Sequence, residues 1–125
     1  MNREKLTSRY EDAYIDFSCN FEDLLELRDL WFKKELKNPC KAQRAQLKNA
    51  LHDAAKFYAV AIRLYKTVAK EYQKSRKVSD DWELGYIRAE IREVNYNVWR
   101  MSNMYAKDKV GKRVNFPKAP AQIAN

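Results

Sequence analysis

Apolar residues recur at alternating intervals of three and four along the last third of the chain, and this spacing limits the fold more than any other feature. The stripe consists of Leu84, Ile87, Ile91, Val94, Val98, Met101 and Tyr105. Such alternation places all of its members on one side of an α-helix. Ser79 is the predicted N-cap, and Asp80 and Asp81 follow it where carboxylates suit the helix dipole. The pattern predicts a long amphipathic helix that ends near Lys107.

The middle of the chain repeats this spacing and predicts another long helix. Asn38 is its predicted cap, and Pro39 occupies the first helical position, where a backbone N–H is not needed. The stripe comprises Leu47, Leu51, Ala54, Tyr58, Ala61, Tyr65, Val68 and Tyr72. We expect this helix to extend to about Lys77.

The first third of the chain carries a comparable stripe. Its members are Tyr10, Tyr14, Phe17, Phe21, Leu24, Leu27 and Trp31. An unbroken helix from about Ser8 to Lys37 is predicted. The alternative is a break near Asn20, because the order Asn20-Phe21-Glu22-Asp23 can cap a new helix, and the chain would then have four helices.

Turn residues are scarce, with two Gly and three Pro among 125 residues. Sandwiches, barrels and doubly wound sheets need many more of them. We therefore predict an all-α fold in which a long antiparallel helical hairpin is joined by a third long helix in a coiled-coil-like bundle. Residues 1–107 form this domain, and residues 108–125, which contain Gly111 and two Pro, form a basic extended or disordered tail.

Several functional classes lack support in the sequence. No apolar run is long enough to cross a bilayer, and no secretory signal begins the chain, so a cytoplasmic location is expected. Cys19 and Cys40 are predicted to be free thiols, and with a single His they are too few for a structural zinc site. Phosphate-binding loops and nucleophile motifs are missing. We expect no enzymatic activity, no metal and no cofactor.

Positive charge is concentrated in the middle helix. The chain has a net charge of +8, and residues 39–78 hold ten Lys and Arg against two acids. These Lys and Arg residues recur mostly at intervals of three or four and form a ridge that can follow a phosphate backbone. The predicted nucleic-acid contacts are Lys41, Arg44, Lys66, Lys70, Lys74, Arg76, Lys77, Lys109, Lys112 and Arg113. The alternative is pairing of the ridge with acids of residues 10–30 across the hairpin.

Two groups of aromatic residues are candidate partner interfaces. One lies off the apolar stripe of the last helix and consists of Trp82, Tyr86, Arg88, Arg92, Tyr96 and Trp99; it suits a protein interface or stacking on bases, unless a wider buried arc covers it. The other is a hairpin tip with Trp31, Phe32 and Leu36, which we expect to project beyond the third helix. A protein partner, a second copy or the folded-back tail would cover that tip.

The leading functional hypothesis is therefore non-enzymatic, sequence-tolerant binding of DNA or RNA by an oligomeric helical protein, of a packaging or filament type. The alternative is an adaptor or inhibitor that presents its exposed aromatic residues to a partner protein. The abundance of Lys, Asn and Tyr with little Gly is typical of small phage and mobile-element proteins. No membrane partner is expected.

Overall fold

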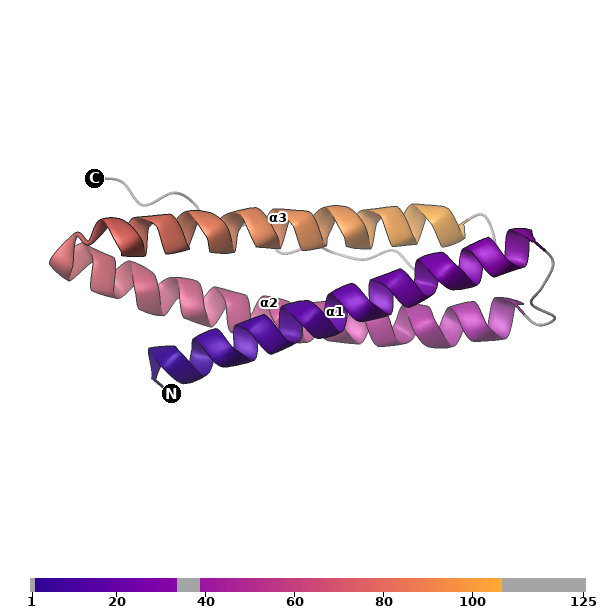
Figure 1. Ribbon diagram of the computed structural model, residues 1–125, viewed down its shortest axis with the longest axis horizontal. Coiled ribbons are helices and arrows are strands. Elements are labelled where there is room, and N and C mark those ends of the chain that lie inside the picture. The colour runs from indigo at the N-terminus through magenta and orange to yellow at the C-terminus, as the bar shows by residue number, and fades with distance from the viewer. Residues whose placement is uncertain (1, 34–38, 107–125) are drawn as a thin grey trace.

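The computed structural model of the chain describes residues 2–33 and 39–106, and every regular element in these ranges is a helix. The helices are α1 (Arg3–Phe32), α2 (Pro39–Ser75) and α3 (Val78–Ala106). Figure 1 shows that α2 turns back along α1 and that α3 turns back along α2, so α1 and α3 run in the same direction. The predicted all-α bundle of three long helices is confirmed. The predicted tail, residues 108–125, lies outside the described residues.

α1 begins five residues earlier than predicted and continues without a break. Asn2 caps it, because its side-chain oxygen accepts the backbone N–H of Lys5 at 2.9 Å. Asn20 does not cap a new helix. Its amide instead donates to Asp53 and accepts from Gln46 at 2.8 Å, both on α2. Asn20, which suggested a helix break, therefore joins α1 to α2 by hydrogen bonds.

A short turn connects α2 to α3. Arg76 has a φ of 55°, the left-handed conformation that often follows a helix end, and its N–H donates to the carbonyl of Tyr72 at 2.8 Å. The carbonyl of Lys77 then accepts the N–H groups of Asp80 at 3.1 Å and Asp81 at 3.3 Å. α3 therefore begins at Val78, and the prediction that Ser79 is its N-cap is wrong, because Ser79 already lies inside the first turn.

The core runs along the three-helix interface. Predicted stripe residues from Leu84 to Met101 are all buried, as are Phe17 and Leu24 on α1. On α2 the buried stripe is rotated from the predicted one. Its members are Gln43, Leu47, Ala50, Ala54, Phe57, Ala61, Leu64, Tyr65 and Val68, so Leu47, Ala54, Ala61, Tyr65 and Val68 of the predicted stripe are buried. Tyr58 and Tyr72 lie only half-buried at the edge of the core, although the Tyr58 hydroxyl itself is buried.

α1 packs mainly on α2, and α3 also packs mainly on α2. Polar contacts join α1 to α3: the Tyr14 hydroxyl donates to Glu93 at 2.9 Å, and Arg3 donates to Asp80 at 2.8 Å. Burial extends along α2 to Leu47, which is only 3% exposed and shares a cluster with Leu24 and Met101. None of the described helices combines the length and apolar character that a bilayer crossing requires.

Candidate nucleic-acid interface

The outer face of α2 carries a continuous row of basic side chains. Most residues of this row are separated from the buried stripe by about half a helical turn, so they point away from the core. Every Lys and Arg of α2 is exposed: Lys41, Arg44, Lys48, Lys56, Arg63, Lys66, Lys70 and Lys74. We call these eight residues the α2 basic row. At about 1.5 Å per residue the row extends for about 50 Å.

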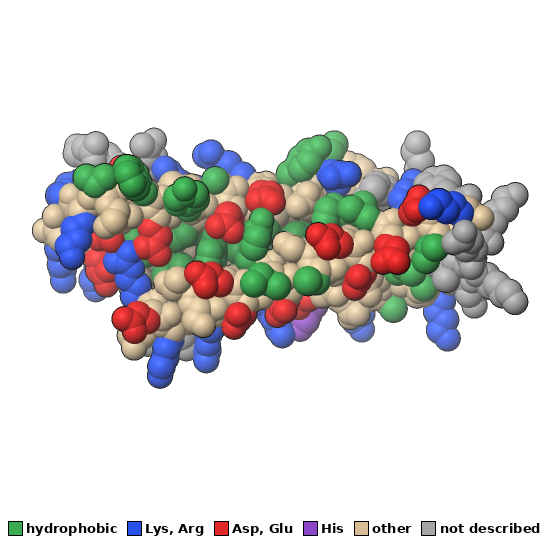
Figure 2. Space-filling model, viewed as in Figure 1, with side chains coloured by type: hydrophobic (Ala, Val, Ile, Leu, Met, Phe, Trp, Pro, Cys, Tyr) green, Lys and Arg blue, Asp and Glu red, His purple; other side chains and the backbone are tan. Residues whose placement is uncertain are grey.

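The α2 basic row is not neutralised by the acids of α1. Among the described residues, the ion pairs are Arg3 with Glu71, Asp80 and Glu83, and Lys33 with Asp29, and none includes a base of the row. The acids of α1 are all exposed on its own outer face: Glu4, Glu11, Asp12, Asp16, Glu22, Asp23, Glu26 and Asp29. Red side chains over α1 are visible in Figure 2. The acids of α1 and the bases of α2 thus lie on the outer faces of different helices, although Lys5, Arg9 and Lys33 are also exposed on the α1 side.

The two charged faces approach each other at one groove between α1 and α2. Asp12 and Asp16 line it from α1, while Asp53 and Lys56 line it from α2. The Asp53 carboxylate accepts a hydrogen bond from the side-chain amide of Asn20. Lys56 is the base of the row nearest to the acidic face, and the bases beyond it face solvent.

The α2–α3 turn adds cationic groups to one end of the row. Arg76 and Lys77 are both exposed, and the Arg76 guanidinium lies over the Tyr72 ring at 5.3 Å from its centroid. Carboxylates also lie at this end, but Arg3 binds Glu71, Asp80 and Glu83 together. The predicted contacts Lys70, Lys74, Arg76 and Lys77 are therefore brought together by the fold.

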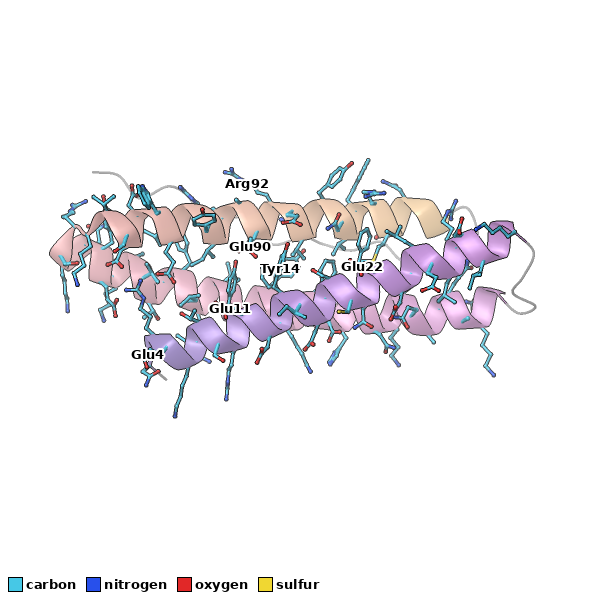
Figure 3. The ribbon with its side chains drawn as sticks, viewed as in Figure 1. Glu4, Glu11, Tyr14, Glu22, Glu90 and Arg92 are labelled. Atoms are coloured by element: carbon cyan, nitrogen blue, oxygen red, sulfur yellow. The ribbon has the colours of Figure 1, made fainter. Side chains whose placement is uncertain are left out.

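The aromatic residues of α3 remain exposed. Trp82 is 68% exposed, Tyr86 70%, Tyr96 57% and Trp99 52%, so a wider buried arc does not cover them within the described residues. The rings of Tyr96 and Trp99 stack at 6.0 Å, and the Arg100 guanidinium lies 5.9 Å from the Tyr96 ring. Green side chains gather along the outer edge of α3 in Figure 2, and Arg92 points away from the bundle in Figure 3.

Three titratable groups lie where α1 faces α3, as Figure 3 shows for Tyr14 and Glu90. Burial and the bond to Glu93 raise the pKa of Tyr14 to about 12. Burial and the nearby Glu90 raise the pKa of Tyr10 as well. Burial also raises the pKa of Glu90, with smaller effects from Glu93 and Glu11, whereas the Tyr10 hydroxyl lowers it. These groups lie at the α1–α3 contact.

Metal ligands do not gather within the described part of the chain: no group of His, Cys, Asp and Glu has the arrangement to hold an ion. His52 is exposed next to the basic row, and Cys19 is an exposed free thiol. The remaining predicted contacts fall outside the described side chains. These are Trp31, Phe32 and Leu36 of the tip and Lys109, Lys112 and Arg113 of the tail.

Sequence reasoning missed two features of this region. The first is the Arg3 cluster, which joins the start of α1 to the α2–α3 turn across a separation of 77 residues. The second is an open hollow over Gly85 on α3, lined by Trp82, Tyr86 and Arg88. A glycine inside a helical stripe between two large aromatic residues was the available signal for the hollow.

Comparisons with known proteins add no assignment to this geometry. No protein-family model matches the chain, and neither a curated protein nor a solved structure matches it.

Proposed function

We propose that the protein binds nucleic acid without catalysis, through the α2 basic row and the adjoining turn. The observation that carries this proposal is the exposure of all eight bases of the row without an ion pair among the described residues. A row of unpaired cations concentrates a polyanion by releasing its counterions. The acidic face of α1 keeps the nucleic acid on the opposite side of the bundle.

The shape of the row favours contacts with the backbone over recognition of base sequence. Basic side chains one helical turn apart, such as those of Lys66 and Lys70, are separated by about 6 Å along the helix axis. That separation is comparable to the distance between successive phosphates of an extended strand. Because the cations are spread along a helix flank, no helix end is presented to a groove for reading base edges. We infer binding that tolerates any sequence.

The segregated charges also support association of several copies on one strand. The acidic α1 face of one molecule is complementary to the basic α2 row of the next, so neighbouring copies attract one another. Light-scattering mass measured with and without a long oligonucleotide tests this point. A mass that grows with the length of the strand supports a coating mode, whereas a constant mass of one protein per strand contradicts it.

The primary test is fluorescence anisotropy with a labelled oligonucleotide between about 50 and 200 mM salt. A triple variant, Lys66→Gln, Lys70→Gln and Lys74→Gln, removes three bases of the row. We expect its affinity to fall and its slope of log affinity against log salt to decrease by about 2 to 3. The matched control is Lys5→Gln, Arg9→Gln and Lys33→Gln, which removes the same charge from α1. Equal loss in both variants, or no binding by the parent protein, contradicts the proposal.

A second candidate function is binding of a protein partner by the α3 aromatic face. The observation that favours it is the exposure of Trp82, Tyr86, Tyr96 and Trp99, because large aromatic residues dominate the energetics of protein interfaces. Such an interface is nearly indifferent to salt. Loss of the oligonucleotide anisotropy signal on adding salt therefore favours the basic row. A protein complex that persists in high salt but is lost in the Trp99→Ala variant favours this alternative.

A further inference from the structure

An open hollow lies over Gly85 on α3. It is lined by the small residues Gly85 and Ala89, by the larger Trp82, Tyr86 and Arg88, and by Asp81, all of them on α3. Its volume is about 650 Å³, and it is shallow and widely open to solvent. Because glycine has no side chain, the floor is level with the helix backbone. A β-carbon at position 85 would meet only the Arg88 guanidinium, at 3.9 Å.

The walls of the hollow suit a flat aromatic ring. Trp82 and Tyr86 lie one helical turn apart and stay 68% and 70% exposed. The Arg88 side chain extends back over the floor, since its Nη2 atom is the atom nearest to a β-carbon at Gly85. A planar ring seated on Gly85 would therefore contact an indole on one side and a guanidinium on the other. Indole and guanidinium planes are the two surfaces on which nucleobases stack most readily in proteins.

The hollow lies at the same end of the bundle as the densest part of the basic row. Arg3 reaches both Glu71 on α2 and Glu83 on α3, so these two residues are at the same level. Lys70 and Lys74 flank Glu71, and Trp82 precedes Glu83. The axes of packed helices lie about 8 to 10 Å apart. The row and the hollow both face outward, so a strand that reaches both must also pass around the end of the bundle. Phosphates on the row and a base in the hollow can belong to one strand that crosses the α2–α3 turn, where Arg76 and Lys77 are exposed.

We propose that the hollow over Gly85 holds an unpaired nucleobase, stacked between Trp82 and Arg88, so that the protein selects single-stranded over double-stranded nucleic acid. This proposal rests on the proposed function and assigns its substrate class. The carboxylate of Asp81, which also lines the hollow, is an acceptor for an N–H group of the base. A duplex keeps its bases stacked on one another and cannot fill the hollow, although its phosphates still contact the row.

The expected loss of affinity follows from the contribution of base stacking to binding. Each base on an aromatic side chain contributes enough that its removal weakens binding by about tenfold or more. Trp82→Ala should therefore weaken binding of a single strand by about tenfold and leave duplex binding unchanged. Gly85→Leu should act in the same way, because the leucine side chain occupies the floor of the hollow. Leucine also favours a helix over glycine, so this variant should fold at least as well as the parent.

The experiment measures anisotropy of labelled dT12 and of a 12-base-pair duplex, at one salt concentration, for the full chain and four variants. Trp82→Ala and Gly85→Leu alter the hollow. Ile15→Ala and Ser8→Leu make comparable changes at exposed positions of α1 and are the controls. We expect the parent and both controls to bind dT12 more tightly than the duplex, and both hollow variants to bind the two probes equally. Circular dichroism and urea unfolding of each variant confirm that it is folded.

The possible outcomes separate the two proposals. If neither probe binds the parent protein, the proposed function fails and this inference fails with it. If both probes bind with equal affinity and Trp82→Ala has no effect, the basic row functions but the hollow does not hold a base. If Trp82→Ala leaves dT12 binding intact and changes the light-scattering mass of the free protein, the hollow is a contact between protein chains. Only a loss of single-strand preference in both hollow variants supports the proposal.

Discussion

The guanidinium of Arg3, in the first turn of α1, donates to the carboxylate of Asp80, in the first turn of α3, at 2.8 Å. The Asp80 side chain is 6% exposed, so its charge depends on this partner for compensation. Arg3 also binds Glu71 at the end of α2 and Glu83 on α3. One side chain therefore joins all three helices at the end of the bundle where the basic row meets the α2–α3 turn.

Arg3→Leu should destabilise the protein by about 2 kcal/mol, because it leaves the buried Asp80 carboxylate without a counterion. The value lies between those of exposed and buried pairs, since Arg3 itself is partly exposed. Urea unfolding followed by circular dichroism measures the change. Lys5→Leu is the matched control, because Lys5 is exposed and has no part in the cluster. An equal effect of the two substitutions would show that the cluster does not stabilise the fold.

Gln43→Met should stabilise the protein by about 1 to 2 kcal/mol. The Gln43 side chain is fully buried, and neither its amide oxygen nor its amide nitrogen has a hydrogen-bond partner in the described part of the chain. Methionine has a similar shape without the buried polar atoms. Gln46→Met is the control, and it should destabilise the protein because Gln46 donates to Asn20 at 2.8 Å. Opposite signs in thermal unfolding would confirm the argument, and equal signs would refute it.

Arg76→Gly should raise the free energy of unfolding by up to about 1 kcal/mol, because glycine adopts a positive φ without steric cost. The gain is partly offset by the greater freedom of glycine in the unfolded chain. Lys74→Gly, two residues earlier and inside α2, should lower it by about 1 kcal/mol. Both variants lose one predicted phosphate contact. Similar losses of affinity with opposite changes in stability would separate the binding role of Arg76 from its role in the turn.

The extent to which the core could be predicted differs between helices for a physical reason. On α3 the aliphatic residues form a single stripe, so Ile91 and Val98 could be assigned to the core with no competing choice. On α2 two adjacent stripes are apolar, because this helix packs against both neighbours. The spacing alone does not distinguish Phe57 from Tyr58. The structure buries Phe57 completely and leaves Tyr58 at the edge.

The candidate nucleic-acid interface could also be predicted only in part. A basic row can be read from the spacing of Lys66, Lys70 and Lys74, because charged residues seldom point into a core. Whether acids neutralise the row depends on the rotation of α1 about its axis, which periodicity does not fix. The Arg3 cluster joins residues distant in sequence, and no local pattern indicates it. Partners of the hairpin tip remain a prediction.

The stability of the α1–α3 contact should depend on the ionisation of Glu90. Burial raises the pKa of this carboxyl in the folded protein, with smaller contributions from Glu93 and Glu11, while the Tyr10 hydroxyl opposes the shift. The folded state therefore binds a proton more tightly than the unfolded state does. Stability must fall as the pH rises from the unfolded pKa through the raised folded pKa, and the full penalty is present above it.

Glu90→Gln should remove this penalty, since glutamine resembles the protonated carboxyl in shape and stays neutral. We expect the variant to match the parent at about pH 4 and to become progressively more stable than the parent toward about pH 7, as measured by urea unfolding at each pH. Glu22→Gln removes a carboxylate from the exposed face of α1 and gives the effect of one surface charge for comparison. A Glu90→Gln advantage that is constant with pH would mean that packing, not ionisation, distinguishes the two proteins.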